Sequence, residues 1–337
     1  MVNNIRSSII YRNTLNNNGK NKRFKYKTAK VNITNKKVIE EIEKYRIPPA
    51  WKKVEITLNK DLIAVGFDEA GRKQYVYSAN HIEKKRLKKY CNLIDFIKVI
   101  PKIRKDIEKN LSKSRLSKEK LIAILLNTII ICSFRIGTDG HKNKYNSYGI
   151  STITKKEMKI SNNNVIIDFI GKKQVRNTCK ITDPKMVRLL KDLYKKTNKS
   201  NDIFRMGNIN ITIVDVNNYL KSFHNNVTSK VFRTWLANTK FINKIIPYFK
   251  DKNKDNKIMD SENKRLKIVR EIKKEVASEM HHTVAVCGKS YLINEMIQLF
   301  IENPEKFNKK IIIKYKNNSK NTGAENALMN YLVSFCS

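Results

Sequence analysis

Hydrophobic and polar residues follow two different periods along the chain, and the change of period predicts two domains. Up to about residue 85, short runs such as VEITL and KQYVYS alternate apolar and polar positions, as strands with one buried face do. From His81 onward, apolar residues recur at every third or fourth position, which is typical of helices. We predict an α+β chain, with a small β-rich domain over residues 1–85 and a larger, mainly α domain over residues 86–337.

The second domain contains local signals for individual elements. Ser117 can cap the apolar helix that starts SKEKLIAILL, and Asp183 followed by proline can cap the helix PKMVRLLKDLY. Between them, the segments EMKI, VIIDFIG and KKQVRNTCKI predict a three-stranded antiparallel sheet whose second turn follows Gly171. Thr322 and Glu325 form a possible capping box for the last helix. Further helices are expected around residues 214–224, 228–247, 261–280 and 290–302.

The charge of the chain adds a statement about its partner. Lys and Arg number 70 against 30 Asp and Glu, which gives a formal net charge of +40 and a pI near 10.0. Such a surface attracts polyanions, most often nucleic acid, and an anionic membrane face is the rival partner. No run approaches the roughly 18 to 20 apolar residues of a membrane span. We therefore expect a soluble, intracellular protein without a membrane partner.

Several kinds of site are not expected from the sequence. The five cysteines stand at wide intervals without CxxC or zinc spacing, so we expect them to be free, reduced and mostly in the core. The chain has no GxxxxGK[ST], no GxGxxG after a strand and no HExxH, so no nucleotide, cofactor or metal site is predicted. Whatever chemistry the protein performs should therefore use its own side chains.

Four segments supply the groups that phosphoryl transfer needs when side chains act alone. Such a reaction requires a nucleophile, cations for the non-bridging oxygens and an acid for the leaving oxygen. Arg135 lies in SFRIGTDGHKNKYNSYG, Lys172 in DFIGKKQV and Arg233 in TSKVFRTWLAN. HHTVAVCGKSYL contains both His282 and Tyr291.

These four segments, in this order, resemble the type IB DNA topoisomerases, especially the poxvirus-like branch of large DNA viruses. The segments IPPAWKKVEI and GFDEAGRKQYVYSANH extend the resemblance into the first domain. It implies that Tyr291 attacks DNA and forms a 3′-phosphotyrosine, with Arg135, Lys172, Arg233 and His282 as catalytic partners. It also implies a monomer that cleaves duplex DNA at a pyrimidine-rich site, in the virion and at the cytoplasmic site of viral replication.

Each candidate side chain also has a purely structural interpretation. An arginine in so basic a chain is usually a surface charge, but Arg135 is expected at the end of a buried helix. Arg233 stands among apolar residues, where an unpaired guanidinium is costly. The nine-residue spacing to the tyrosine favours His282 over the neighbouring His281, which we interpret as scaffold. Lys173 leaves open which lysine is the general acid, and we favour Lys172 because it directly follows a glycine.

In the first domain, the resemblance implies DNA contacts for Gln74, Tyr75, Tyr77 and His81. Because side chains alternate along a strand, the two tyrosines can share one face. Glutamine could then read adenine in the major groove. The structural alternative is a sheet surface with two core tyrosines.

Two rival functions stay open. Tyrosine recombinases share the same catalytic set, but their second arginine usually lies in HxxR, whereas Lys230 gives KxxR here. A non-enzymatic DNA-compaction protein would also explain the charge. The expected architecture is a C-shaped clamp in which both domains enclose duplex DNA.

Overall fold

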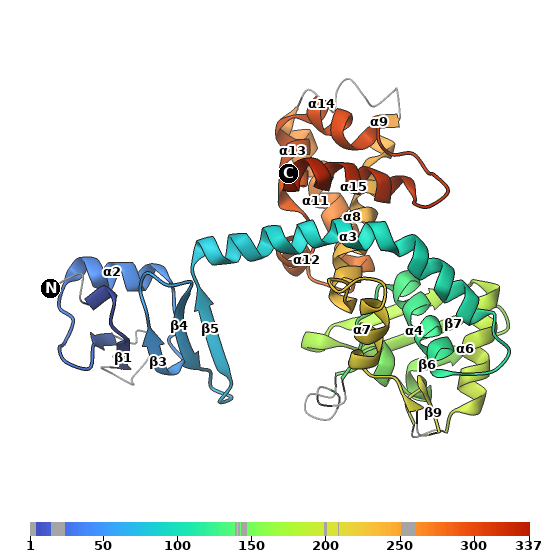
Figure 1. Ribbon diagram of the computed structural model, residues 1–337, viewed down its shortest axis with the longest axis horizontal. Coiled ribbons are helices and arrows are strands. Elements are labelled where there is room, and N and C mark those ends of the chain that lie inside the picture. Colours follow the sequence, from blue (N-terminus) through green and yellow to red (C-terminus); the bar gives the residue numbers. More distant parts are fainter. Residues whose placement is uncertain are drawn as a thin grey trace. The chain divides into compact units, whose positions relative to one another are not determined.

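Two compact units make up the chain, residues 1–89 and residues 90–337. Helix α3, Ala79–Leu111, begins in the first unit and continues into the second, so the two units meet within one helix. The structure is a computed structural model (Figure 1), and it describes residues 5–14, 24–138, 140, 142, 147–198, 201–207, 209–250 and 261–337.

The first unit is an antiparallel five-stranded sheet with the order β2-β1-β3-β4-β5 (Figure 1). Helix α2, Lys36–Lys44, begins at Asn35, whose side chain accepts a hydrogen bond from the backbone of Val38. Val38 and Ile42 of this helix join the sheet residues in a small apolar core. The strands are β1 Ile10–Thr14, β2 Phe24–Lys27, β3 Lys52–Ile56, β4 Leu62–Phe67 and β5 Lys73–Tyr77.

The hairpin between β4 and β5 is held by one carboxylate. Asp68 accepts hydrogen bonds from the backbone N–H and the Nε of Arg72, at 2.9 and 2.8 Å, and from Nε2 of Gln74, at 2.8 Å. Gly71 adopts a φ of +73°, which a residue without Cβ adopts at no steric cost. These hydrogen bonds lower the pKa of Asp68, so the turn is stabilised by an ionised carboxylate.

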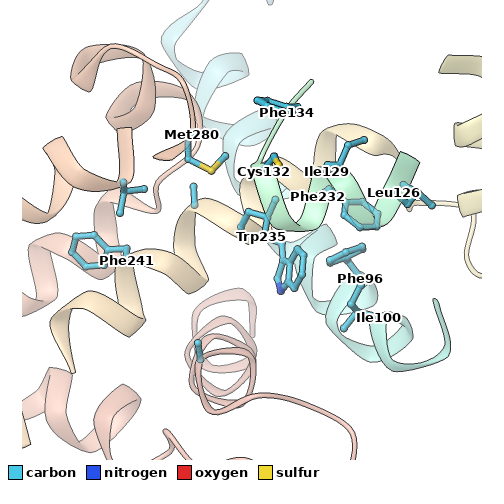
Figure 2. Packing of buried hydrophobic residues seen from close by; sticks show 14 of the residues in the cluster. Phe96, Ile100, Leu126, Ile129, Cys132, Phe134, Phe232, Trp235, Phe241 and Met280 are labelled. Carbon is cyan, nitrogen blue, oxygen red and sulfur yellow. The ribbon is translucent and has the colours of Figure 1, made fainter. Parts of the chain in front are cut away.

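The second unit is mainly helical and is built around α4 and α8. Figure 2 shows Phe96 of α3 beside Phe232 and Trp235 of α8, and the rings meet edge to face at 4.8 and 5.4 Å between centroids. Ser117 caps α4, as predicted, by accepting from the backbone of Lys120. The helices are α4 Lys118–Cys132, α6 Pro184–Lys196, α7 Ile213–Lys221, α8 Ser229–Ile245, α9 Pro247–Lys250, α11 Glu262–Glu279, α12 Val284–Ser290, α13 Asn294–Glu302, α14 Pro304–Phe307 and α15 Gly323–Cys336, with shorter turns at η1 Ile150–Thr152, η2 Lys155–Glu157, η3 Lys172–Gln174 and η4 Asn308–Ile312.

The predicted three-stranded antiparallel sheet of this unit is confirmed, with the order β6-β7-β8. Its strands are β6 Met158–Ile160, β7 Val165–Ile170 and β8 Arg176–Ile181. A shorter ribbon pairs β9 Arg205–Met206 with β10 Ile209–Asn210. The turn from β7 to β8 is closed by a 2.8 Å hydrogen bond from the N–H of Gly171 to the carbonyl of Val175.

The prediction that the cysteines are free is wrong for four of the five. Disulfides join Cys91 to Cys336 and Cys132 to Cys179, and only Cys287 has a free, buried thiol. The paired residues are 245 and 47 positions apart in sequence, yet their Cα atoms lie 5.9 and 5.6 Å apart. That proximity comes from tertiary packing, which sequence spacing does not reveal.

The C-terminal helix α15 is tied to the rest of the second unit. The predicted capping box is confirmed, because Thr322 accepts from the backbone of Glu325, whose carboxylate accepts from Thr322. The same fully buried carboxylate receives both outer nitrogens of Arg104 from α3. Among the described residues, no single helix is long and apolar enough to cross a membrane; α12 and α13, bent by 100°, pass that test only as a pair.

Candidate active site

Four of the five predicted catalytic side chains converge in the second unit. Nη2 of Arg135 lies 3.0 Å from Nδ1 of His282 and donates to the hydroxyl of Tyr291 at 3.4 Å. Nη2 of Arg233 lies 2.6 Å from Nε2 of the same histidine. The His282 and Tyr291 rings are stacked, with centroids 4.6 Å apart. The cluster therefore surrounds one tyrosine hydroxyl with two guanidinium groups and an imidazole.

Arg233 is a buried cation held by neutral groups. It is 5% exposed on α8 and donates to the backbone carbonyls of Ser133 and Met280. Its Nε is buried without a hydrogen-bond partner, and no carboxylate in the described residues pairs with Arg233 or Arg135. Burial and then the nearby Arg135 lower the pKa of Arg233 to about 10, so it remains charged at neutral pH. Such a group is ready to receive an anion.

The sequence predicted that Arg135 lies at the end of a helix. In the structure, Arg135 instead reaches the cluster from an irregular segment. Helix α4 ends at Cys132 because Ser133 adopts a left-handed conformation with φ of 57°. The segment is then fixed by a 2.8 Å hydrogen bond from the N–H of Ile150 to the carbonyl of Arg135. Two residues later Gly137 passes so close to η1 that an added Cβ would lie 2.4 Å from the hydroxyl of Thr152.

Tyr291 lies between two helices, where a buried amide holds its backbone. It follows α12 and precedes α13, whereas the sequence predicted one helix from residue 290 to 302. Asn238 of α8, which is 0% exposed, donates to the carbonyl of Tyr291 at 2.9 Å. Its Oδ1 accepts from the N–H of Ile293 at 3.0 Å. Sequence analysis missed Asn238; its position five residues after Arg233 in an apolar helix was the available signal.

The charges of the cluster set its protonation. Burial, then Arg233 and Arg135, lower the pKa of His282 to about 3, so its ring is neutral at neutral pH. Burial by itself raises the pKa of Tyr291, but Arg233 and Arg135 outweigh burial and bring that pKa below its ordinary value. The site therefore favours a tyrosine that loses its proton readily, which is what a nucleophile needs.

Lys172 is not joined to this cluster. It begins the turn η3 between β7 and β8, its side chain is exposed, and no hydrogen bond or ion pair within the described residues links it to the other four. Its neighbour Lys173 adopts a left-handed φ of 63°. Val175, at the end of the same turn, lines a cavity of about 650 Å³ together with His282. One end of the Lys172 turn therefore borders the same cavity as His282, although Lys172 itself is not hydrogen-bonded to the cluster.

In the first unit, the structure groups three of the four predicted DNA-binding residues. The rings of Tyr75, Tyr77 and His81 form a stack, with centroid distances of 6.3 and 4.8 Å. Nδ1 of His81 lies 3.0 Å from a carboxylate oxygen of Asp61. Gln74 alternates with the tyrosines and therefore points to the other face of β5, where it donates to Asp68. DNA contact by any of these four residues stays a prediction.

A tyrosine hydroxyl beside the buried guanidinium of Arg233 and the partly buried one of Arg135 is the arrangement expected of enzymes that transfer a phosphodiester to tyrosine. Among the described residues, no three His, Cys, Asp or Glu side chains form a group that could hold a metal ion.

The comparisons identify the family within that class. Residues 78–318 match the family model of the eukaryotic DNA topoisomerase I catalytic core. The chain is 33% identical over 285 residues to DNA topoisomerase 1B of Acanthamoeba polyphaga mimivirus, which covers 80% of this chain and 82% of that protein. It is 30% identical over 139 residues to DNA topoisomerase I of monkeypox virus, covering 41% and 44% of the two chains. The chain belongs to the type IB DNA topoisomerases, in their viral branch.

Proposed function

We propose that this type IB topoisomerase relaxes supercoiled duplex DNA by cutting and resealing one strand through Tyr291. The observation that carries the proposal is the tyrosine hydroxyl within reach of Arg135, in a cluster that also contains Arg233 and His282. Oη of the tyrosine attacks the scissile phosphorus, the bond from phosphorus to the 5′-oxygen breaks, and a 3′-phosphotyrosine forms. Because one phosphodiester replaces another, the 5′-hydroxyl can reverse the step without ATP.

The two arginines would bind the non-bridging oxygens. A guanidinium presents a planar fork of donors that meets two oxygens and keeps its charge at any working pH. The unpartnered Nε of Arg233 supports this role, because phosphate would satisfy a donor that is otherwise buried alone. His282, neutral and between both arginines, would donate its single N–H to one of the same oxygens.

Lys172 would act as the general acid for the departing 5′-oxygen. Its exposed position on a hairpin turn lets it reach DNA bound beside the cluster. In the first unit, the stacked rings of Tyr75, Tyr77 and His81, flanked by Lys73 and Lys85, would contact the duplex. A C-shaped clamp of the two units, a monomeric state and a pyrimidine-rich cleavage site complete the proposal.

Plasmid relaxation tests the proposal. Supercoiled plasmid is incubated with the full chain in EDTA without ATP, deproteinised, and its topoisomers are separated. Relaxation by the wild type and none by Tyr291→Phe is the expected result, because that substitution removes only the hydroxyl. A compaction protein would leave the linking number unchanged, and relaxation by Tyr291→Phe would show that another residue is the nucleophile.

A further inference from the structure

The disulfide between Cys132 and Cys179 joins two segments that each lead to a proposed catalytic residue. Cys132 is the last residue of α4, and three residues later the chain reaches Arg135. Cys179 lies in β8, the strand that returns from the turn carrying Lys172. One covalent bond therefore connects the arginine segment with the lysine hairpin.

The end of α4 also contacts the rest of the catalytic cluster. The carbonyl of Cys132 accepts a hydrogen bond from Nε2 of His281 at 2.9 Å, next to the catalytic histidine. The following carbonyl, of Ser133, accepts from Arg233. The hairpin packs here as well, because the rings of Phe134 and Phe169 meet edge to face at 5.0 Å. The end of α4 is therefore held in the cluster by these hydrogen bonds as well as by the disulfide.

The disulfide lies on the wall of the cavity that contains His282. Cys132 and Cys179 both line this space of about 650 Å³, as do Arg176 and Lys240. A small thiol can enter a cavity of that size. Arg176 is paired with Asp168, and Lys240 with Glu279, which also lines the cavity. The thiolate is the leaving and the attacking species in exchange.

We propose that Cys132–Cys179 is a thiol–disulfide exchange site whose state sets how firmly the Lys172 turn is held beside the catalytic cluster. The inference rests on the proposed function, because it concerns the general acid named there. Disulfides of proteins in reducing compartments are most often transient or redox-sensing. The position of Cys132–Cys179 between two proposed catalytic segments fits that use.

The co-reactant is a small dithiol. Its thiolate attacks one protein sulfur, the protein S–S bond breaks, and a mixed disulfide forms while one cysteine leaves as a thiolate. The second thiolate of the reductant then displaces the other cysteine, closing a cyclic disulfide within the reductant. Two electrons pass to the protein, and two protons convert the cysteine thiolates to thiols. Oxidation of the two thiols by a disulfide of the same class reverses the exchange.

The disulfide ties the middle of the hairpin to α4, and the turn with Lys172 lies beyond this link. Cys179 pairs with Ile167 in the middle of β7 and β8, and Lys172 lies beyond this pair at the tip. After reduction, the hairpin keeps its strand pairing but loses its covalent link to α4. The lysine is then positioned less well for proton transfer. Reduction should therefore slow the step that needs a proton and spare the attack by Tyr291.

The experiment compares single-turnover cleavage by the full chain, oxidised or reduced with dithiothreitol, after thiol alkylation and mass spectrometry have verified each state. One substrate has the normal 5′-oxygen, and the other has sulfur there, which leaves as a thiolate without a proton. We expect reduction to slow cleavage of the oxygen substrate about tenfold, since small misplacements of a catalytic group have effects of this size or larger. The sulfur substrate should be cleaved at equal rates in both states.

Three variants separate this effect from a general loss of structure. Cys179→Ser should behave like the reduced wild type in either condition. Cys336→Ser, which opens the other disulfide, and Cys287→Ser, which removes the free thiol, should both keep the redox response. Loss of the redox response in Cys336→Ser would show that the response depends on the Cys91–Cys336 disulfide, and would overturn the proposal.

Two further outcomes would also overturn it. One is an unchanged rate on the oxygen substrate although alkylation shows that the bond has opened, and the other is equal slowing of both substrates. Lys172→Ala distinguishes this failure from that of the proposed function. If the sulfur substrate rescues Lys172→Ala while the cleavage rate of the wild type is the same in both redox states, only the disulfide inference fails. If sulfur does not rescue Lys172→Ala, the general-acid assignment fails.

Discussion

At the scale of single residues, the site is organised around a positive charge without a partner of opposite sign. Within the part of the chain that the structure describes, the outer nitrogens of Arg233 contact two backbone carbonyls and His282, and its Nε has no hydrogen-bond partner. A buried cation without a counterion destabilises the free protein. The same arrangement is already oriented toward phosphate when DNA binds, so the cost in stability becomes a gain in transition-state binding.

Removing either guanidinium should therefore affect chemistry more than binding. We expect Arg233→Ala and Arg135→Ala each to slow single-turnover cleavage by about 10²-fold or more, the effect of losing one preorganised oxyanion donor. Arg233→Lys should recover only part of the rate, because a lysine has the charge but not the fork. The exposed Arg188 of α6 is the matched control, and Arg188→Ala should cleave normally. If Arg233→Ala cleaved DNA at the wild-type rate, Arg233 would be a phosphate anchor and not a catalytic residue.

The partly buried His282 makes the stability of the second unit depend on pH. The pKa of His282 is about 3 in the fold and near 6.5 when unfolded, so below 6.5 the unfolded state binds a proton that the folded state does not. Stability from this residue is therefore present above pH 6.5 and is lost as the pH falls from 6.5 toward 3.

Urea unfolding at a series of pH values measures this effect. His282→Gln, which cannot take up that proton, should lose stability less steeply than the wild type between pH 6.5 and 4. His224→Gln, a partly exposed histidine elsewhere in the unit, is the control and should follow the wild-type slope. Parallel curves for His282→Gln and the wild type would contradict the prediction.

At the scale of elements, helix α8 contributes both the charge of Arg233 and the side chain of Asn238, which holds the backbone around Tyr291. Asn238→Ala would leave the carbonyl of Tyr291 and the N–H of Ile293 without their partner, at a cost of about 1 to 3 kcal/mol in unfolding free energy. Asn238→Asp keeps the acceptor but not the donor. We expect both to slow cleavage, whereas Asn243→Ala on the same helix, in an exposed position, should not. Single-turnover cleavage with parallel unfolding curves separates misplacement of the tyrosine from loss of fold.

The turn between β7 and β8 tests which lysine is the acid. Lys172→Ala should lose about 10² to 10⁴ in cleavage rate on a normal phosphodiester, and a sulfur leaving group should restore most of it. Lys173 is held in the left-handed region, so Lys173→Gly should keep the turn and the rate. If the sulfur substrate rescues a Lys173 variant and leaves Lys172→Ala slow, the two assignments must be exchanged.

Local signals were sufficient for many elements and insufficient for their assembly. Caps at Ser117 and Asp183 and the β6–β8 sheet could be read because each depends on residues near in sequence. The end of α4 was misplaced because the left-handed conformation of Ser133 comes without the glycine that usually signals it. The disulfide pairs and the two hydrogen bonds of Asn238 were not predicted, since they join segments far apart in the chain.

At the scale of the whole molecule, the net charge of +40 governs association with DNA. Binding releases counterions from the phosphates that the protein neutralises, so the logarithm of the affinity should fall by about 0.9 per contacted phosphate for each decade of salt. Titrations of labelled duplex at several salt concentrations measure the slope. Replacing the exposed Lys85, which flanks the proposed DNA-contacting tyrosines, with alanine should reduce the slope by about one contact, while Lys185→Ala on α6 serves as the comparison. A salt-independent affinity would argue for another partner.

The bond between Cys91 and Cys336 closes residues 91–336 into a ring of polypeptide. A single cut by a protease anywhere within the ring opens it without releasing a fragment. The two pieces made by such a cut would separate on a denaturing gel only after a reductant has opened the disulfide.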